Sequence, residues 1–464
     1  MRRTFIAKAR GGFLLATVAF AALSQATPVA AESIEAAMAR AYASSPTMNA
    51  QRASARATDE NVPQARAGYR PKVNATADAG MLYSSINGPT AQAGQSRYFP
   101  RGIGATIDQT IFNGFRTDNA ISQAESLILQ ARESVRNTEQ QVLLNAATAY
   151  MNVLRDTATL NLKRNNVEVL EEQVRQTKDR FQVGEVTRTD VAQAEASLAG
   201  GRSDASVAES NLKSSIASYR QVIGVEPKKL EAAAPIEKKL PNTLDSAVKL
   251  SLGEHPQIIA ALHGVDAQLM QVKQIEGELA PSLAARGAVS QRWDNNIANV
   301  SGFTGSVVAT LSVPIYEGGQ TYSRVRQAKE TLGQRRIDVD TARDTVRQAV
   351  IAAWGSLEAA KAQIISGREQ VRAAEVALAG VREEAKVGQR TTLDVLNAQQ
   401  TLLNARVALI SSQRDRVVAS YTVLSAVGRL SSQSLSLNVA AYDPKVHYEQ
   451  VKDSWFGLRT PDGR

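Results

Sequence analysis

The residue types that most often do chemistry are sparse and scattered in this chain. It has three histidines, His255, His263 and His447, and no cysteine, so the sequence predicts no metal site. No phosphate-binding loop or GxGxxG segment opens a helix after a strand. Paired glutamates occur at 171–172 and 383–384, but adjacent residues of a helix point in different directions and cannot act as a carboxylate pair. We therefore expect no catalytic residues and no cofactor. If the function of the protein requires energy, a partner must supply it.

Two segments, VGEVTRTD and VGQRTTLD, combine a glycine with a threonine and an aspartate at fixed spacing. Thr187-x-x-Asp190 and Thr391-x-x-Asp394 have the spacing of a capping box, with Asp in place of the usual Glu or Gln. The sequence thus predicts that a helix begins at each place. The residues alone explain the two aspartates as capping acids near a positively polarised helix N-terminus.

Residues 1–31 are typical of a secretory signal peptide. Four basic residues precede an apolar run over 13–23, and Val29-Ala30-Ala31 offers a cleavage site, so the mature chain is expected to begin at Glu32. The apolar run is shorter than the roughly 20 residues that a membrane-spanning helix needs, so any bilayer-embedded part would have to consist of strands. Loss of those four basic residues lowers the formal charge from +9 to +5. Acids and bases are interleaved along the chain, which argues against a nucleic-acid partner.

The chain repeats itself at an offset of 204 residues: ATIDQTIFNGF from Ala105 matches ATLSVPIYEGG from Ala309, and the two VG segments match each other. The expected organisation is a signal peptide (1–31), a first structural repeat (32–224), a proline-containing linker (225–241), a second structural repeat (242–428) and a C-terminal tail (429–464). The tail is polar and weakly patterned, so we expect it to be peripheral and periplasmic.

Each repeat should start with a helical stretch, at 33–67 and 242–278, followed by two strands. The first strands are expected at about 72–84 and 282–293. The second strands alternate, with apolar residues at 103, 105, 107 and 111 and at the odd positions of 303–315, and mostly polar residues at even positions. A period of two over about ten residues is the pattern of a barrel strand with an apolar outer face and a polar inner face. The alternative is one face of a soluble sheet.

About 70 residues without proline follow each second strand, and apolar residues recur in them every seven positions. Sustained heptads predict helices packed side by side. At 1.5 Å per residue, such a helix is on the order of 100 Å long. Val183-Gly184 and Val387-Gly388 should end these helices, because Gly is suited to the left-handed residue that closes a helix. Each repeat therefore ends in a long helical hairpin with a tight tip.

Counting strands predicts an oligomer. Four strands per chain cannot close a barrel, and an open edge in lipid leaves backbone groups without hydrogen-bond partners. Two chains would give a barrel filled by side chains, whereas three chains would give a wider one. A homotrimer is the smallest assembly with a lumen, and it would contain twelve strands above twelve helices.

The chain resembles the TolC family of outer-membrane channels. The resemblance rests on the duplicated layout, on NGF and EGG after the second strands, on Ala149-Tyr150 and Ala353-Trp354, and on the VGxxT tips. It implies a mainly α fold with a membrane β-barrel: a homotrimer whose 12-stranded barrel lies among outer-membrane lipid and continues into a 12-helix coiled-coil tube in the periplasm. It also implies the exit duct of a tripartite efflux or type I secretion system, which passively conducts drugs or polypeptides from an inner-membrane pump.

The same resemblance assigns roles at the tips. Asp394 corresponds to an acid that lines the periplasmic aperture, and Asn397 stands where a second acid would be. Asp190 and Thr189 correspond to residues that bond to an arginine, here Arg390, and hold the tips closed. The alternatives are that Asp394 only caps a helix and that Arg390 is a solvated arginine.

Contact with a periplasmic adaptor, a membrane fusion protein, is expected at Val183-Gly184 and Val387-Gly388. Glycine there permits the turn and lets another hairpin approach closely. A second hypothesis is that the chain is itself a periplasmic coiled-coil adaptor or scaffold. Adaptors also have helical hairpins, but they lack lipid-facing strand pairs, so the alternation in both repeats favours the duct. The cargo and the identity of the partners are not encoded in these patterns.

Overall fold

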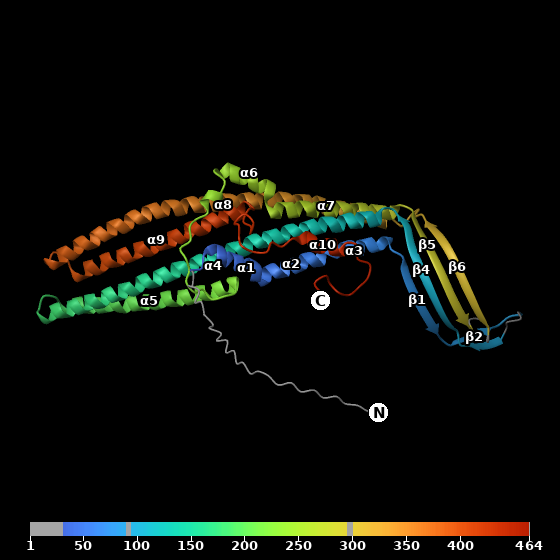
Figure 1. Ribbon diagram of the computed structural model, residues 1–464, viewed down its shortest axis with the longest axis horizontal. Coiled ribbons are helices and arrows are strands. Elements are labelled where there is room, and N and C mark those ends of the chain that lie inside the picture. The colour runs from blue at the N-terminus through green and yellow to red at the C-terminus, as the bar shows by residue number, and fades with distance from the viewer. Residues whose placement is uncertain (1–30, 90–93, 295–299, 464) are drawn as a thin grey trace, which may run out of the picture.

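The computed structural model describes residues 31–89, 94–294 and 300–463. The predicted signal peptide therefore lies outside the described residues, apart from Ala31. The molecule is elongated, with long helices that extend away from a sheet at one end (Figure 1). Within the described ranges, no helix is both long and apolar enough to cross a membrane.

The first half of the chain contains the 3-10 turn η1 together with these helices and strands: α1 Ile34–Ser44, α2 Pro46–Asp59, α3 Asn61–Arg66, η1 Ala67–Tyr69, β1 Lys72–Ala79, β2 Leu82–Ile86, β3 Gly94–Tyr98, β4 Arg101–Asn113, α4 Arg116–Gln182 and α5 Arg188–Ile223. The second half follows a similar order: η2 Glu237–Lys239, α6 Leu244–Glu254, α7 Pro256–Glu276, η3 Gly277–Leu279, β5 Ser282–Trp293, β6 Ser301–Ser312, α8 Gln320–Lys386, α9 Thr392–Ala426 and α10 Pro444–Val451. Helix α8 begins and ends 204 residues after α4, so the structural offset equals the sequence offset.

Proline divides the helical stretch that starts each half. Pro46 opens α2 and Pro256 opens α7, because proline lacks the amide that the preceding turn would use. The residue before each proline caps the new helix. The Ser45 hydroxyl accepts a hydrogen bond from the Met48 amide at 3.4 Å, and His255 Nδ1 accepts one from the Gln257 amide at 3.2 Å.

The main sheet is antiparallel, in the order β1-β4-β5-β6. Its register aligns Val73 with Ile107, and Val289 with both Ala105 and Gly305, so odd-numbered residues share one face as far as Thr110, where a register shift pairs Phe112 with Leu283. Even-numbered residues share the other face, where Asp108 of β4 pairs with Arg286 of β5. The predicted alternation is thus confirmed across strand boundaries as well as along each strand.

The expected first strand over 72–84 is wrong at its end. Strand β1 stops at Ala79, and Leu82–Ile86 instead pairs with Gly94–Tyr98 in a separate two-stranded sheet. The break lies at Gly80 and Pro100, which face each other in the same register: the Gly80 amide donates to the Pro100 carbonyl at 2.8 Å, but Pro100 has no amide to donate in return. Strands β2 and β3 therefore extend the β1–β4 hairpin in the same register, beyond a short interruption.

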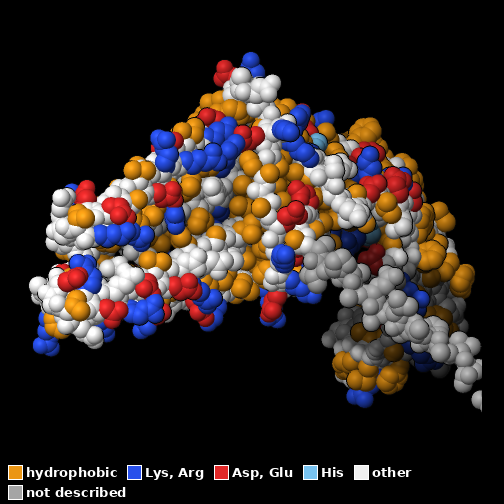
Figure 2. Space-filling view, turned by 60° about the vertical axis from the view of Figure 1, so that its left-hand side comes forward, with side chains coloured by type: hydrophobic (Ala, Val, Ile, Leu, Met, Phe, Trp, Pro, Cys, Tyr) orange, Lys and Arg blue, Asp and Glu red, His pale blue; other side chains and the backbone are white. Residues whose placement is uncertain are grey.

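Helix α4 packs along α5, and α8 packs along α9. Helix α7 lies against both α4 and α8 and so joins the two halves beside the sheet. Each of α4 and α8 has 67 residues, which corresponds to about 100 Å at 1.5 Å per residue. Figure 2 shows acidic and basic side chains intermixed over the outside of the helices, as expected for solvated faces.

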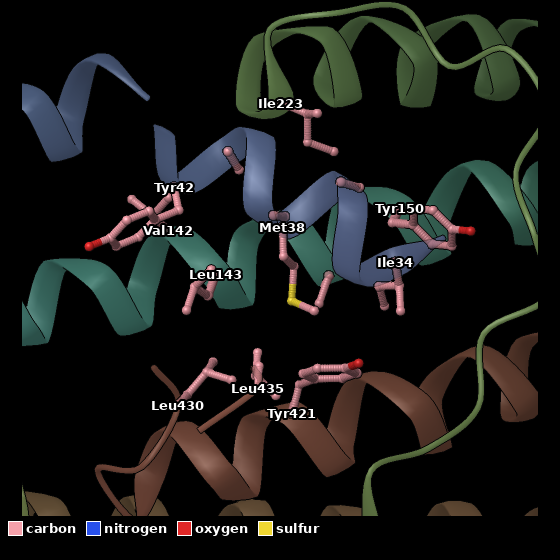
Figure 3. Packing of buried hydrophobic residues seen from close by; sticks show 14 of the residues in the cluster. Ile34, Met38, Tyr42, Val142, Leu143, Tyr150, Ile223, Tyr421, Leu430 and Leu435 are labelled. Atoms are coloured by element: carbon pink, nitrogen blue, oxygen red, sulfur yellow. The ribbon is translucent and has the colours of Figure 1, made fainter. Parts of the chain in front are cut away.

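The largest core cluster lies near the middle of the helices, where α1 packs against α4 and α5 and faces α9 (Figure 3). Met38 of α1 is fully buried and points toward Tyr421 and Leu435. The Tyr150 hydroxyl lies 2.6 Å from the Glu32 carbonyl oxygen and 2.7 Å from the Glu231 carbonyl oxygen, which share its single proton. These bonds hold the expected first residue of the mature chain and the segment between the two halves against α4.

The expectation of a peripheral tail is wrong. Leu430, Leu435 and Leu437 are all buried in the largest core cluster, and Tyr442 packs against its edge. Burying each such apolar side chain contributes roughly 1.5–3 kcal/mol. The sequence did not indicate that these leucines are buried, because polar residues separate them and a segment with irregular turns shows no helical or strand periodicity.

Candidate channel tips

The two hairpin tips have nearly the same backbone. Gly184 and Gly388 adopt the left-handed conformation, with φ of 83° and 79°. After each glycine, the next amide reaches back to the previous helix: Glu185 N donates to the Arg180 carbonyl and Gln389 N to the Glu384 carbonyl, both at 2.9 Å. This is the hydrogen bond of a Schellman-type helix end. The predicted turns at both glycines are confirmed.

The predicted capping boxes are also present. The Thr187 amide donates to Asp190 Oδ2 and the Thr391 amide to Asp394 Oδ2, both at 2.9 Å, while each threonine hydroxyl accepts from the aspartate amide. Hydrogen bonds from the Thr187 hydroxyl and amide lower the pKa of Asp190. The bond from the Thr391 amide, followed by that from its hydroxyl, lowers the pKa of Asp394. Within one chain, these hydrogen bonds favour the ionised form of both aspartates, which cap the N-termini of α5 and α9.

The outer surface of each tip is open. Val183 and Val387 are 72% and 71% exposed. A Cβ added at Gly184 or Gly388 would meet nothing within 4 Å, so the space beside the turns is free. These four residues lie where the sequence predicted adaptor contact, and that role remains a prediction.

The arginine predicted to lock the tips has another partner in this chain. Arg390 Nε donates to Glu384 Oε2 at 2.8 Å, whereas Asp190 bonds to Thr187. Thr189 is exposed on the first turn of α5. Asp190 and Arg390 nevertheless line the same cavity between the two tips. The structure brings the two residues to one cavity without joining them, so the lock remains a prediction.

The residues predicted to line the aperture lie on α9. Asp394 is the capping acid, and Asn397 is exposed three residues later in the same helix. A separation of three residues places both on one side of α9. Their convergence on an axis requires further copies of the chain, and it remains a prediction.

Two contacts behind the tips were not predicted. Gln399 of α9 donates to Asn166 of α4 at 3.2 Å and so links the two hairpins. A Cβ at Gly201 would lie 2.7 Å from Leu170 Cδ1, so the absence of a side chain lets α5 approach α4. The pair Gly200-Gly201 inside a helix was the available signal for the second contact, while nothing in the sequence marks the first.

Comparison with known proteins decides the family. The family model described as outer membrane efflux protein matches residues 37–225 and 247–429. The chain belongs to the outer membrane efflux protein family. This efflux protein is 42% identical to the outer membrane efflux protein BepC of Brucella suis over 437 residues, which cover 93% of each chain. It is 27% identical to the outer membrane protein TolC of Escherichia coli over 74% of this chain and 77% of that protein.

The fold of this efflux protein is also found in solved structures. The outer membrane channel CmeC of Campylobacter jejuni matches with a TM-score of 0.78 at 17% identity, over 90% of this chain and 89% of that one. This structure shows the TolC-like fold, and the family match together with the 42% identical efflux protein shows that the chain is an outer-membrane exit duct. The alternative of a periplasmic adaptor or scaffold is set aside.

Proposed function

We propose that three copies of the chain close into one conduit. The main sheet has two open edges, β1 and β6, and its strands alternate in direction from β1 to β6. Strand β6 of one copy can therefore meet β1 of the next copy in an antiparallel pair. Three copies of four strands make a closed barrel of twelve, which removes every open edge from the lipid. The alternating sheet with two open edges is the observation that carries the proposal.

The helices support the same assembly. Ile337, Ile351 and Ile365 of α8 are 67%, 48% and 67% exposed. They are spaced by fourteen residues, or two heptads, and so lie along one stripe of the helix. A stripe of exposed isoleucines on a coiled-coil helix needs a neighbouring helix to remove it from water. In the proposed trimer that neighbour belongs to the next copy, and twelve long helices surround the lumen.

The tips are the proposed meeting point with a periplasmic adaptor and, through it, an inner-membrane pump. Exposed Val183 and Val387 offer apolar contact beside glycines whose lack of a side chain permits close approach. The duct itself is proposed to conduct passively and to use no catalytic residue or cofactor. Drugs or secreted polypeptides would pass through it with energy supplied by the pump.

The proposed gate uses the charged residues between the tips. Arg390 bonds to Glu384 in the single chain, and we propose that it moves to Asp190 and Thr189 when the trimer closes. In both arrangements the guanidinium binds a carboxylate, and Glu384, whose side chain is 45% exposed, is left to water when Arg390 moves. Three Asp394 side chains, followed by three Asn397 amides, would then line the narrowest point.

The assembly can be tested by cross-linking, because the chain has no cysteine of its own. Thr76 of β1 and Thr304 of β6 lie at the same level of the sheet, on its even face. The double variant Thr76→Cys with Thr304→Cys, treated with a bifunctional maleimide in native membranes, should give a covalent trimer.

The matched control replaces Thr304→Cys by Ser290→Cys, which lies at the same level but on the inner strand β5. This control should yield little cross-linking between chains. A membrane-inserted monomer in native mass spectrometry, together with no covalent trimer in the edge variant, would overturn the proposed assembly.

A further inference from the structure

The segment that follows α10 is tied to the helices that precede the sheet. Arg66 of α3 forms an ion pair with Asp453. Arg70 Nη1 donates to the Ser454 carbonyl at 2.5 Å, and the Arg70 guanidinium carbon lies 4.6 Å from the centre of the Trp455 ring. Figure 1 shows the chain beyond α10 running beside α3 toward the strands before it turns back. Three contacts therefore fix one side of this loop.

The loop is also held at its C-terminal end, whereas the side chains at its tip are exposed. Arg56 of α2 lies 3.8 Å from Asp462, measured from Nε to Oδ2. Between the tethers, Phe456 and Leu458 are 92% and 103% exposed, and Trp455 is 63% exposed. Leaving such side chains in water is unfavourable relative to burying them. A loop that is fixed at both ends and exposes its apolar side chains is suited to place them in an apolar environment outside the chain.

The position of the tip indicates what that is. Arg70 lies two residues before β1, and the carbonyl of the adjacent Tyr69 accepts a hydrogen bond from Gln109 Nε2 at 2.9 Å. Gln109 occupies an odd position of β4, on the apolar face of the sheet that includes Val73 and Ile107. The loop is therefore continuous with the rim of the surface that faces lipid in the proposed barrel.

We propose that Trp455, Phe456 and Leu458 form a lipid anchor that enters the periplasmic leaflet of the outer membrane beside the barrel. The inference rests on the proposed function, because it needs the odd face of the sheet to contact lipid. Tryptophan is enriched at membrane interfaces, where its ring lies at the level of the head groups. Phe456 and Leu458 supply the apolar part, and Arg459 follows them with a positive charge suited to lipid phosphate. The anchor would restrain rotation and tilt of the tube relative to the membrane.

Tryptophan fluorescence can test the anchor, because the chain has only three tryptophans. Full-length protein with Trp293→Phe and Trp354→Phe reports on Trp455 alone. In proteoliposomes of phosphatidylglycerol and phosphatidylcholine, lipid brominated near the glycerol end of its acyl chains should quench Trp455. The double variant Phe456→Ser with Leu458→Ser should lose much of this quenching. Val446→Ser, which removes an exposed apolar side chain from α10, should not.

A second single-tryptophan protein separates this inference from the proposed barrel. Trp354→Phe with Trp455→Phe leaves Trp293, which lies on the odd face of β5. Quenching of Trp293 without quenching of Trp455 would overturn the anchor and leave the barrel intact, whereas no quenching of either would overturn both. Protection of Trp455 from brominated lipid and also from aqueous iodide would assign the loop to a neighbouring copy and would equally overturn the anchor.

Discussion

The hairpins α4–α5 and α8–α9 end in turns with the same geometry but differ in the charges around them. The first tip pairs Arg180 with Glu185, whereas the second pairs Glu384 with Arg390, so the acid now precedes the turn. Behind the tips the two hairpins agree again, because Arg202–Glu171 and Arg406–Glu375 are ion pairs at matching positions, each at 2.7 Å. Duplication has thus kept the residues that build the hairpin and changed those that lie between the tips. The two tips of one chain therefore share a backbone conformation but can have different functions.

The largest effect is expected from crowding the open side of either turn. Gly184→Trp and Gly388→Trp each place a bulky side chain at a left-handed residue in free space, which strains the turn and blocks the close approach of an adaptor. Export should fall to the level of a strain without the protein, while trimers still form. Drug susceptibility or secretion, compared with trimer yield in mild detergent, measures this.

Gly253→Leu is the matched control, because Gly253 also has free space around it but lies on α6, away from the tips. It should leave export unchanged. Normal export in both tip variants would indicate that docking occurs elsewhere.

Acid should weaken the second half of the chain through His255, whose counterpart in the first half is Ser45. Burial, followed by the nearby charge of Arg136, lowers the pKa of His255 from 6.5 to about 4. The folded state keeps this histidine neutral, so its contribution to stability is complete above about pH 6.5 and is lost as the pH falls toward 4. At about 1.4 kcal/mol per pKa unit, the loss is about 3 kcal/mol in all.

His255→Ser should remove this acid sensitivity, because Ser45 caps the equivalent helix without titrating. The measurement is thermal unfolding of wild type and variant between pH 7 and pH 5. Parallel decreases in melting temperature for the two proteins would contradict the role of His255.

The smallest effect concerns the glycine pair that only the first hairpin has. A Cβ at Gly200 would meet nothing within 4 Å, so Gly200→Ala should stabilise the helix by about 1 kcal/mol. Gly201→Ala should gain much less, because its Cβ must displace Leu170. Equal melting temperatures for the two variants would show that α5 and α4 do not depend on this close approach.

The sequence alone predicted the regular parts of the hairpins well. Heptads, a glycine that ends one helix and Thr-x-x-Asp that begins the next are local signals, and both copies repeated them. The odd and even faces of the sheet followed from alternation for the same reason. Pro100, which cannot return the hydrogen bond of Gly80, lies on the opposite strand, so the interruption between β1 and β2 was missed.

The contacts that the sequence did not predict are those between distant segments. Leu435 in the core, Gln399 against Asn166, and the partner of Arg390 depend on how separate elements pack, and no local pattern records that. Arg390 is the clearest case. Its neighbours in sequence include both Glu384 and Asp394, while Asp190 reaches the same cavity from a hairpin 200 residues away.

The claim that the second tips, and not the first, line the aperture can be tested most directly by the ion preference of single channels in planar bilayers. Asp190→Asn and Asp394→Asn disturb matching capping boxes, so each serves as the structural control for the other. If the second tips converge on the trimer axis, their carboxylates form an acidic ring that attracts cations. Asp394→Asn should then reduce both cation preference and block by multivalent cations. Asp190→Asn removes a partner of the proposed lock, so it should raise conductance while the Asp394 carboxylates still favour cations. Unchanged ion preference and block in Asp394→Asn would show that Asp394 only caps α9 and that the gate has been assigned to the wrong residues.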